Sequence, residues 1–219
     1  MVKLIKNLIF AGGLLALSAG LIYWTEAEKE IKVLCQMFNP GDEAGYVNTT
    51  LETANLMSYE RQQDQLIMKS AYNLYTASCS IEFTENDLIS VRSYRTTFNL
   101  SSFLVWVSVF ISAGYMIFQF LLAMGYPLGE YAWGGKKKVL PNSYRYGSGV
   151  SVLIFAFSIL LLLGYEFDFM RIPEAFPVFG ILFLISSIAN FNSESRKEKR
   201  TGTPAAILLY LTYLALSIL

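Results

Sequence analysis

The sequence of 219 residues contains no histidine and only two cysteines. Without histidine there can be no Ser-His-Asp triad, no bis-histidine haem and none of the common histidine-containing zinc sites. Two cysteines are too few for an iron–sulfur cluster or a thiolate metal cage. No phosphate-binding glycine motif follows a predicted strand. We therefore expect no cofactor and no metal, and an enzyme is not favoured.

Charge is also scarce, at 16% of the residues against 54% apolar, and five long stretches lack it altogether. The charge-free stretches are 8–24, 103–124, 147–165, 175–191 and 204–219. At 1.5 Å per residue, 16 to 22 residues span roughly 24 to 33 Å, close to the ~30 Å hydrocarbon core of a bilayer. We predict a bundle of five transmembrane helices. The missing intramembrane charges disfavour a pump, an ion-coupled carrier or a voltage sensor.

The zero net charge conceals a strong asymmetry between the connecting segments. Segments 1–7, 125–146 and 192–203 together hold ten basic and three acidic residues, whereas 25–102 and 166–174 hold seven basic and fourteen acidic residues. Short cytoplasmic loops favour lysine and arginine. This predicts a multi-pass protein of a bacterial plasma (inner) membrane, with a cytoplasmic N-terminus and residues 25–102 outside.

The first apolar stretch has two interpretations. Lys3 and Lys6 before an apolar run that ends in small residues also suit a signal peptide, but the run is long and Tyr23-Trp24 is typical of an interfacial anchor. We favour an uncleaved anchor, residues 1–24. Gly12, Ala16 and Gly20 form a stripe of small residues that favours close helix packing, unless the stripe simply faces lipid.

Residues 25–102 are predicted to form a small extracytoplasmic α+β domain. Ile31, Leu34, Cys35 and Phe38 follow helical spacing, and Asn39-Pro40-Gly41 breaks the helix. A second short helix is predicted through 42–54, followed by four short strand-like runs that form an antiparallel sheet.

Both cysteines, Cys35 and Cys79, fall within this outer domain. Disulfides persist in an oxidising compartment, and closing a loop of about 45 residues stabilises a small domain by roughly 4 kcal/mol. We predict a disulfide between them. Two buried free thiols are the alternative.

The loop GYPLGEYAWGGKKKVLP, residues 125–141, combines glycine, proline, aromatic residues and three lysines. One interpretation is an interfacial hairpin that fixes topology, with aromatic anchors and with lysines near anionic lipid. The other is an anionic-headgroup or phosphate site. Its predicted polar cluster comprises Glu130, Gly134, Gly135, Lys136, Lys137, Lys138, Arg145, Asn190 and Arg196. Asn190 and Gln119 alternatively serve as interhelical glue. Thr203-Pro204 suits the start of the last helix.

Two resemblances accompany these patterns. The motifs GxPxGExxxGGxxxxLPxxxRxGS and AN-FNSESRKEKR-x-x-x-P, within residues 103–219, resemble an uncharacterised family of bacterial multi-helix integral membrane proteins. That resemblance implies a compact bundle in a bacterial plasma membrane and assigns no catalytic residue. Residues 29–91, with PGDEAGYVNTTLETA before CSIEFTENDLISV, resemble the outer-membrane-assembly lipoproteins of the BamE/SmpA type, which implies a role in docking other proteins.

These observations predict three parts: an anchor over residues 1–24, an outer α+β domain over 25–102 and a four-helix bundle over 103–219. The favoured function is a non-catalytic membrane subunit or scaffold that packs against partner helices and docks a protein through its outer domain. The alternative is a lipid- or headgroup-binding membrane protein. The expected partners are membrane lipids and a membrane protein or further copies of the chain; no nucleic acid is expected.

Overall fold

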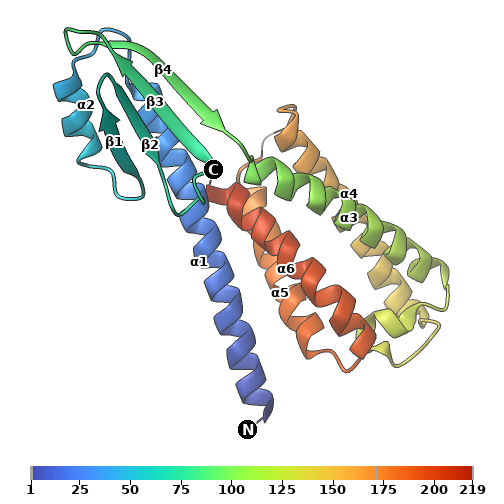
Figure 1. Cartoon of the computed structure of the whole chain (residues 1–219). Helices are drawn as coiled ribbons and strands as arrows, with labels where there is room; N and C mark the ends of the chain where they lie inside the picture. Colours follow the sequence, from blue (N-terminus) through green and yellow to red (C-terminus); the bar gives the residue numbers. More distant parts are fainter. Residues whose placement is uncertain (1, 171, 219) are drawn as a thin grey trace. The chain divides into compact units, whose positions relative to one another are not determined.

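A computed structural model describes residues 2–170 and 172–218. Within them the chain is mostly helical, with six α-helices and a four-stranded antiparallel sheet in the order β1-β2-β3-β4 (Figure 1). Five of the helices are long and apolar enough to cross a membrane. The chain divides into two compact units, one formed by the chain up to Asn99 with its last two residues, the other by Leu100–Ser217.

In the first unit, α1 (Val2–Met37) continues without a break from the apolar stretch into the predicted amphipathic helix. The unit also contains α2 (Ala44–Leu51), β1 (Ser58–Gln62), β2 (Gln65–Lys69), β3 (Ala77–Phe83) and β4 (Ile89–Thr96). No helix-breaking residue stands between residues 24 and 28, so the stretch predicted as an anchor and the first helix predicted for residues 25–102 form one continuous helix.

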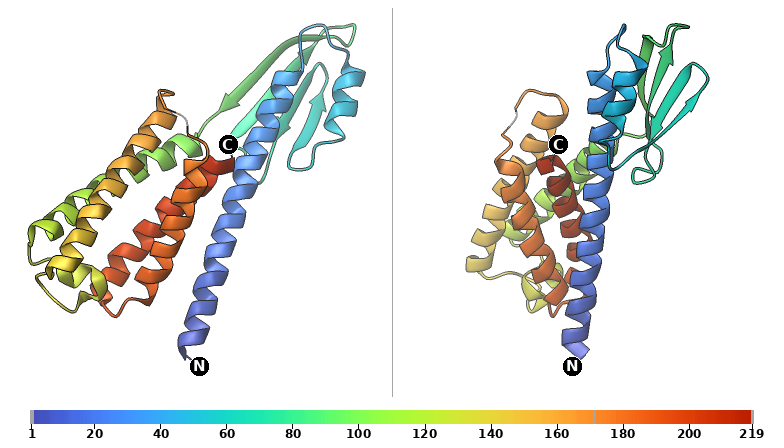
Figure 2. Two further views of the ribbon diagram at one scale, coloured as in Figure 1. Left: turned by 180° about the vertical axis from the view of Figure 1, so that it is seen from behind. Right: turned by 90° about the vertical axis from the view of Figure 1, so that its left-hand side faces the viewer.

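One face of the sheet packs on α1 and α2 (Figure 2). Side chains alternate between the core and solvent along β2 and β3, as the two-residue period of a strand requires. The core contributed by α1 lies between Ile31 and Phe38. The predicted disulfide is present and joins Cys35 on α1 to Cys79 on β3.

Polar contacts also fix α1 to this unit. The carboxylate of Glu30 accepts hydrogen bonds from the backbone amides of Asn55 and Leu56, at 3.0 and 2.9 Å. Arg92 on β4 donates to the carbonyl of Cys35 at 2.9 Å and to two further carbonyls at the end of α1. The Arg92 contacts satisfy carbonyls that the last turn of a helix leaves without intrahelical partners.

The second unit contains α3 (Leu100–Met124), α4 (Asn142–Glu166), α5 (Ala175–Asn192) and α6 (Arg196–Ile218). Its core is aromatic. Tyr213 is fully buried, and its ring lies 5.2 to 6.2 Å from the rings of Phe176, Phe179 and Phe183. Buried serine and threonine hydroxyls form the polar part of the same interior.

These hydroxyls bond across helices. Ser158 lies 3.3 Å from the hydroxyl of Ser112 and 2.8 Å from that of Tyr213, and Ser108 lies 2.7 Å from Thr212. None of these residues belongs to the sites predicted from the sequence. Within apolar helices they act as glue, because each hydroxyl finds a partner on a neighbouring helix.

Candidate functional site

Two connecting segments lie at one end of the helical unit, the hairpin of residues 125–141 and residues 192–203, which run from the end of α5 through a short loop into the first turns of α6; together they are named the loop pair. The first is a compact hairpin with two 3-10 turns, η1 (Gly129–Tyr131) and η2 (Trp133–Gly135). The amide of Gly129 donates to the carbonyl of Lys138 at 2.8 Å and closes the hairpin. A Cβ on Gly129 would lie 2.2 Å from the carbonyl oxygen of Lys137. Only glycine therefore allows this close approach.

The second loop ends where α6 begins, at Arg196. Ser195 caps the helix: its hydroxyl accepts the amide of Glu198 at 3.2 Å, and its carbonyl accepts the amide of Lys199 at 3.0 Å. The prediction that the helix starts at Thr203-Pro204 is wrong. The helix capped by Ser195 begins at Arg196 and completes more than one turn before Pro204. Pro204 therefore lies inside the helix.

Glu198 joins the two loops. One of its carboxylate oxygens accepts the backbone amide of Gly134 at 2.9 Å and also the hydroxyl of Ser193. A second link runs the other way, from the hydroxyl of Ser195 to the carbonyl of Glu130 at 2.6 Å. A Cβ on Gly135, which has a left-handed φ of +69°, would lie 2.5 Å from that of Ser195. The two loops therefore interlock through backbone and side chain.

Ion pairs add to this contact at the exposed surface. Glu130 pairs with Lys197 and lies 3.8 Å from Lys138, while Lys136 lies 3.2 Å from Glu194. Exposed pairs of this kind contribute little stability individually. Their consequence is electrostatic: two of the three lysines of the hairpin already face carboxylates of the chain itself.

The other residues of the predicted polar cluster do not converge on one anion-binding site. The amide of Gly134 donates to Glu198 and that of Gly135 donates to the carbonyl of Ala132 at 2.9 Å, so neither amide is open to an anion. Lys137 and Arg196 are exposed. Arg145 folds over Gly125 and donates to the carbonyl of Leu140 at 2.9 Å.

Trp133 connects the hairpin to α4. Its indole nitrogen donates to the hydroxyl of Ser148 at 3.1 Å, and its ring covers Gly147, where a Cβ would lie 2.8 Å from the ring. The Tyr144 ring lies 5.3 Å away. The small residues at the start of α4 therefore receive an aromatic side chain of the hairpin.

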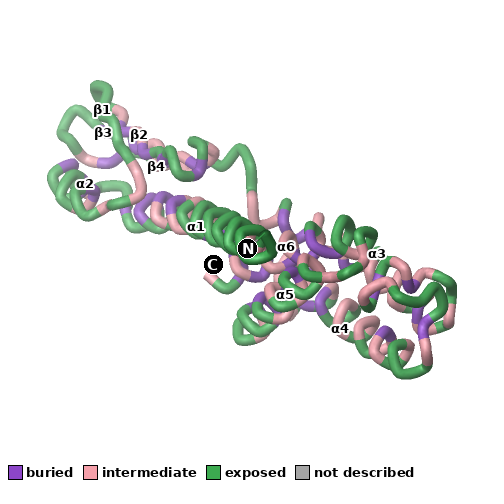
Figure 3. The backbone as a smooth tube through the Cα atoms, turned by 90° about the horizontal axis from the view of Figure 1, so that it is seen from below, coloured by how far each residue is buried: buried purple, intermediate pink, exposed green. Residues whose placement is uncertain are grey.

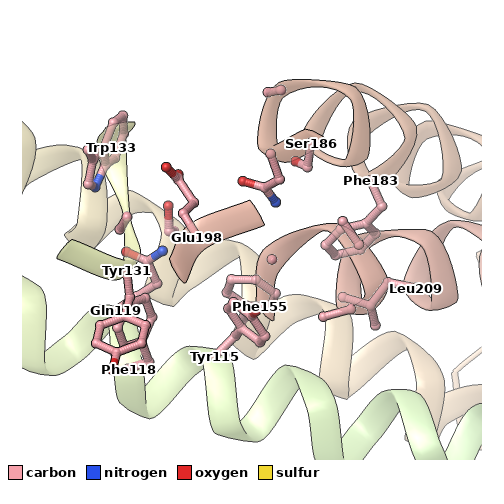
Figure 4. Close-up of a pocket in the computed structure, with 17 residues that line it drawn as sticks. Tyr115, Phe118, Gln119, Tyr131, Trp133, Phe155, Phe183, Ser186, Glu198 and Leu209 are labelled. Atoms are coloured by element: carbon pink, nitrogen blue, oxygen red, sulfur yellow. The ribbon is translucent and has the colours of Figure 1, made fainter. Parts of the chain in front are cut away.

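A cavity of about 300 Å³ lies beneath the loop pair (Figure 4). Most of its wall is aromatic or aliphatic, with Gln119, Asn190 and Glu198 among the polar exceptions. The side-chain oxygen of Gln119 is buried without a hydrogen-bond partner among the described residues. The lining residues are Tyr115, Phe118, Gln119, Tyr131, Ala132, Trp133, Ser151, Phe155, Phe183, Ser186, Ala189, Asn190, Glu198, Gly202, Ala205, Ala206 and Leu209.

Asn190 lies against Gly202, where a Cβ would come within 2.8 Å of its amide nitrogen. It therefore lies at a close approach of α5 and α6 as well as on the cavity wall. A second hollow of about 330 Å³ shares Tyr115, Phe118 and Tyr131 with the first. Across residues 2–170 and 172–218, no three histidine, cysteine, aspartate or glutamate side chains gather as a metal site would require.

Comparison with models of protein families, with curated proteins and with solved structures gave no match. The two family resemblances described from the motifs stay predictions.

The charge state of Glu130 gives a direct test of the ion pairs. The hydrogen bond and charge of Lys197 hold the pKa of Glu130 below its ordinary value of 4.5. Because the folded pKa is the lower one, the pair is intact above pH 4.5 and is lost as the pH falls through the folded pKa. We expect a carbon-13 titration of labelled glutamate in the detergent-solubilised protein to show a midpoint below 4.5.

Lys197→Gln should return that midpoint to the ordinary range. Lys136→Gln is the matched control, because Lys136 pairs with Glu194 and should leave Glu130 unchanged. A Glu130 midpoint that does not respond to Lys197→Gln would contradict the pairing.

Proposed function

We propose that the protein is a non-catalytic subunit of a membrane assembly, which packs against partner helices through α1 and docks a protein through its α+β unit. The observation that carries this proposal is the apolar length of α1. The core of its unit uses α1 only between Ile31 and Phe38. The preceding part of α1 is largely exposed (Figure 3). Its large apolar side chains include Leu8, Ile9 and Leu15, which are 63 to 71% exposed.

The stripe of small residues on α1 is accessible as well. A Cβ added at Gly12 or Gly20 would meet no atom within 4 Å. Small residues let helix backbones approach closely in lipid, where van der Waals packing rather than the hydrophobic effect drives association. The stripe therefore suits a partner helix.

The loop pair supports a structural role rather than a catalytic one. Its carboxylates, Glu130, Glu194 and Glu198, all have partners within the loop pair. A general base or nucleophile needs an accessible reactive atom beside a substrate. The geometry instead favours closure of the helical unit by interlocked loops.

The membrane placement is part of the proposal. Charge asymmetry supports a bacterial inner membrane with the N-terminus and the loop pair in the cytoplasm and the disulfide-bearing unit outside. Single cysteines at Glu60, Lys137 and Lys197 test this in intact cells with a membrane-impermeant thiol reagent. We expect labelling at Glu60→Cys only. Labelling of Lys137→Cys or Lys197→Cys in sealed cells would contradict the proposed orientation.

The assembly itself is tested by native mass spectrometry after mild extraction from the membranes of the producing cell. We expect the chain in a complex, with a partner protein or with further copies. Gly12→Leu combined with Gly20→Leu should dissociate that complex, because leucine fills the space in which a helix would lie. Leu15→Phe, off the stripe, is the matched control and should leave it intact. A chain that extracts as single copies without other proteins would contradict the proposal.

The cavity supports a second candidate, the binding of an anionic lipid. Its aromatic walls suit an apolar body, and the acceptor oxygens of Gln119 and Glu198 suit a headgroup that donates hydrogen bonds. Lys137 of the neighbouring hairpin, which is exposed, suits a phosphate. Phosphatidylglycerol combines these properties, because its headgroup carries both a phosphate and hydroxyl donors.

Ala189→Leu tests this candidate, since Ala189 lines the cavity and a larger side chain fills it. We expect the purified protein to retain phosphatidylglycerol in preference to phosphatidylethanolamine, and Ala189→Leu to lose it. Glu130→Gln is the control, because Glu130 is absent from the cavity wall. Equal lipid retention by both variants would rule the cavity out as the site.

A further inference from the structure

The loop between β2 and β3 presents large apolar side chains to the surface. Tyr72, Leu74 and Tyr75 are exposed at 52, 69 and 60%. The loop lies at the end of the sheet from which α1 continues toward its N-terminus (Figure 2). Three large apolar side chains within four residues are costly in water, so their exposure calls for a partner.

This loop has a defined conformation. The amide of Tyr75 donates to the carbonyl of Ser70 at 2.9 Å, and the amide of Thr76 donates to that of Asn73 at 3.1 Å. Leu74 and Tyr75 both have left-handed backbone, with φ of +53° and +60°. A left-handed residue other than glycine costs about 1 to 2 kcal/mol. The fold holds leucine and tyrosine where glycine would be less strained, which points to a use for their side chains.

Ring contacts place the loop at a particular level along α1. The Tyr72 ring stacks on that of Tyr23 at 5.3 Å, and the Trp24 ring lies 6.5 Å from that of Phe98. Tyr23 and Trp24 end the first charge-free stretch, and Phe98 lies two residues before α3 begins. The loop is therefore level with both points at which the chain passes between the α+β unit and an apolar helix.

The opposite end of the sheet has the reverse character. The turns at residues 62–65 and 84–88 are joined by the ion pair between Arg61 and Asp87. Asp64, Glu85 and Asp87 are all exposed there. One end of the α+β unit is thus aromatic and apolar, and the other is acidic.

We propose that the aromatic end is a membrane-interface belt that seats the α+β unit on the outer surface of the bilayer. The belt consists of Tyr23, Trp24, Tyr72, Leu74, Tyr75 and Phe98. Tyrosine and tryptophan favour the headgroup layer, where an apolar ring and a polar tip are both accommodated, and Leu74 reaches toward the acyl chains. The acidic end then points away from the membrane. This inference rests on the proposed insertion of α1 and α3, and not on any protein partner.

The test attaches the environment-sensitive dye NBD to single cysteines in the full chain, reconstituted in phosphatidylcholine vesicles with nitroxide-labelled lipids. Dye on Leu74→Cys should be quenched about threefold more by headgroup-level nitroxide than dye on Glu85→Cys. Dye on Leu15→Cys reports the insertion of α1 itself through a nitroxide deep in the acyl chains. A non-reducing gel confirms that the native disulfide is intact in each variant.

The outcomes separate the two proposals. An unquenched Leu15→Cys dye would refute insertion and with it the proposed function. If the dye on Leu15→Cys is quenched and the dye on Leu74→Cys is not, α1 is inserted but the belt proposal is wrong. This holds whether the dye on Leu74→Cys is exposed to water or shielded by protein.

A second variant separates the belt from a folding role. Leu74→Gly with Tyr75→Gly keeps the left-handed backbone and removes both side chains, so the unfolding midpoint should not fall. Quenching of a dye on the adjacent Ala71→Cys should nevertheless drop about twofold as the loop lifts from the lipid. Unchanged quenching, or a lowered midpoint, would show that these side chains serve the fold and not the membrane.

Discussion

Gly129→Ala is expected to destabilise the helical unit by about 3 kcal/mol, the upper part of the usual range for overpacking a buried site. Gly129 is buried, and the new methyl group would lie 2.2 Å from the carbonyl oxygen of Lys137 and 3.0 Å from that of Lys138. Backbone atoms cannot turn aside as a flexible side chain can. The hairpin must therefore open, and the links from Gly134 and Glu130 to the second loop open with it.

The matched control is Gly134→Ala in the same hairpin. Gly134 has a left-handed φ of +81°, but a Cβ there would meet no atom within 4 Å. Alanine at that position should cost only the backbone strain, about 1 kcal/mol. The loss of stability of each variant is measured by reversible unfolding in mixed micelles that contain an increasing fraction of denaturing detergent. Equal losses for the two variants would show that the closure between Gly129 and Lys138 does not support the helical unit.

Several features of the fold follow from strong sequence signals. Each of α3, α4 and α5 contains the charge-free stretch predicted for it, because a long run without charge has few other physical explanations. The disulfide could also be predicted, since only one pair of cysteines exists. The sheet could be predicted because its short β-rich runs are separated by polar turns.

The start of α6 differs from the prediction because a proline is compatible with the interior of this helix as well as with its first turn. Proline suits the first turn of a helix, and Thr203-Pro204 therefore resembled a beginning. A stronger signal lay upstream, in Ser195 followed by Glu198 three residues later, the spacing of a capping box. Apolar helix bundles tolerate an internal proline, because neighbouring groups satisfy the backbone that it frees.

The geometry of the loop pair could be predicted only in outline. Charge and glycine content identified both segments, but not that Glu198 bonds the amide of Gly134 or that Ser195 bonds the carbonyl of Glu130. Such contacts depend on how two loops 60 or so residues apart meet, which no local pattern encodes. The buried network around Ser158 cannot be predicted from the sequence for a related reason: a serine in an apolar helix has the same local sequence whether it faces lipid or a neighbouring hydroxyl.

Removing the disulfide by Cys35→Ala with Cys79→Ala is expected to lower the stability of the α+β unit by about 4 kcal/mol. The bond joins α1 to β3 across a sequence separation of 44 residues, so its loss releases much of the unit in the unfolded chain. Both positions are buried, at 2 and 0% exposure, and the alanine variant also gives up sulfur packing in the core. The free energy of unfolding of a whole domain is typically only 5 to 15 kcal/mol. The loss of stability is measured by unfolding the full chain in denaturant. Proteolytic cleavage after Arg61 and Arg92 is the readout of the unfolded α+β unit.

The reduced protein supplies the control for this prediction. A reductant should lower the unfolding midpoint of the unaltered chain and leave the double variant unchanged, because the variant has no bond to break. If reduction changes neither protein, the two sulfurs are not bonded in the membrane-extracted chain. That result would remove the main chemical support for an exported α+β unit, since a compartment that sustains the bond is oxidising. The topology would then depend on the charge asymmetry of the loops alone.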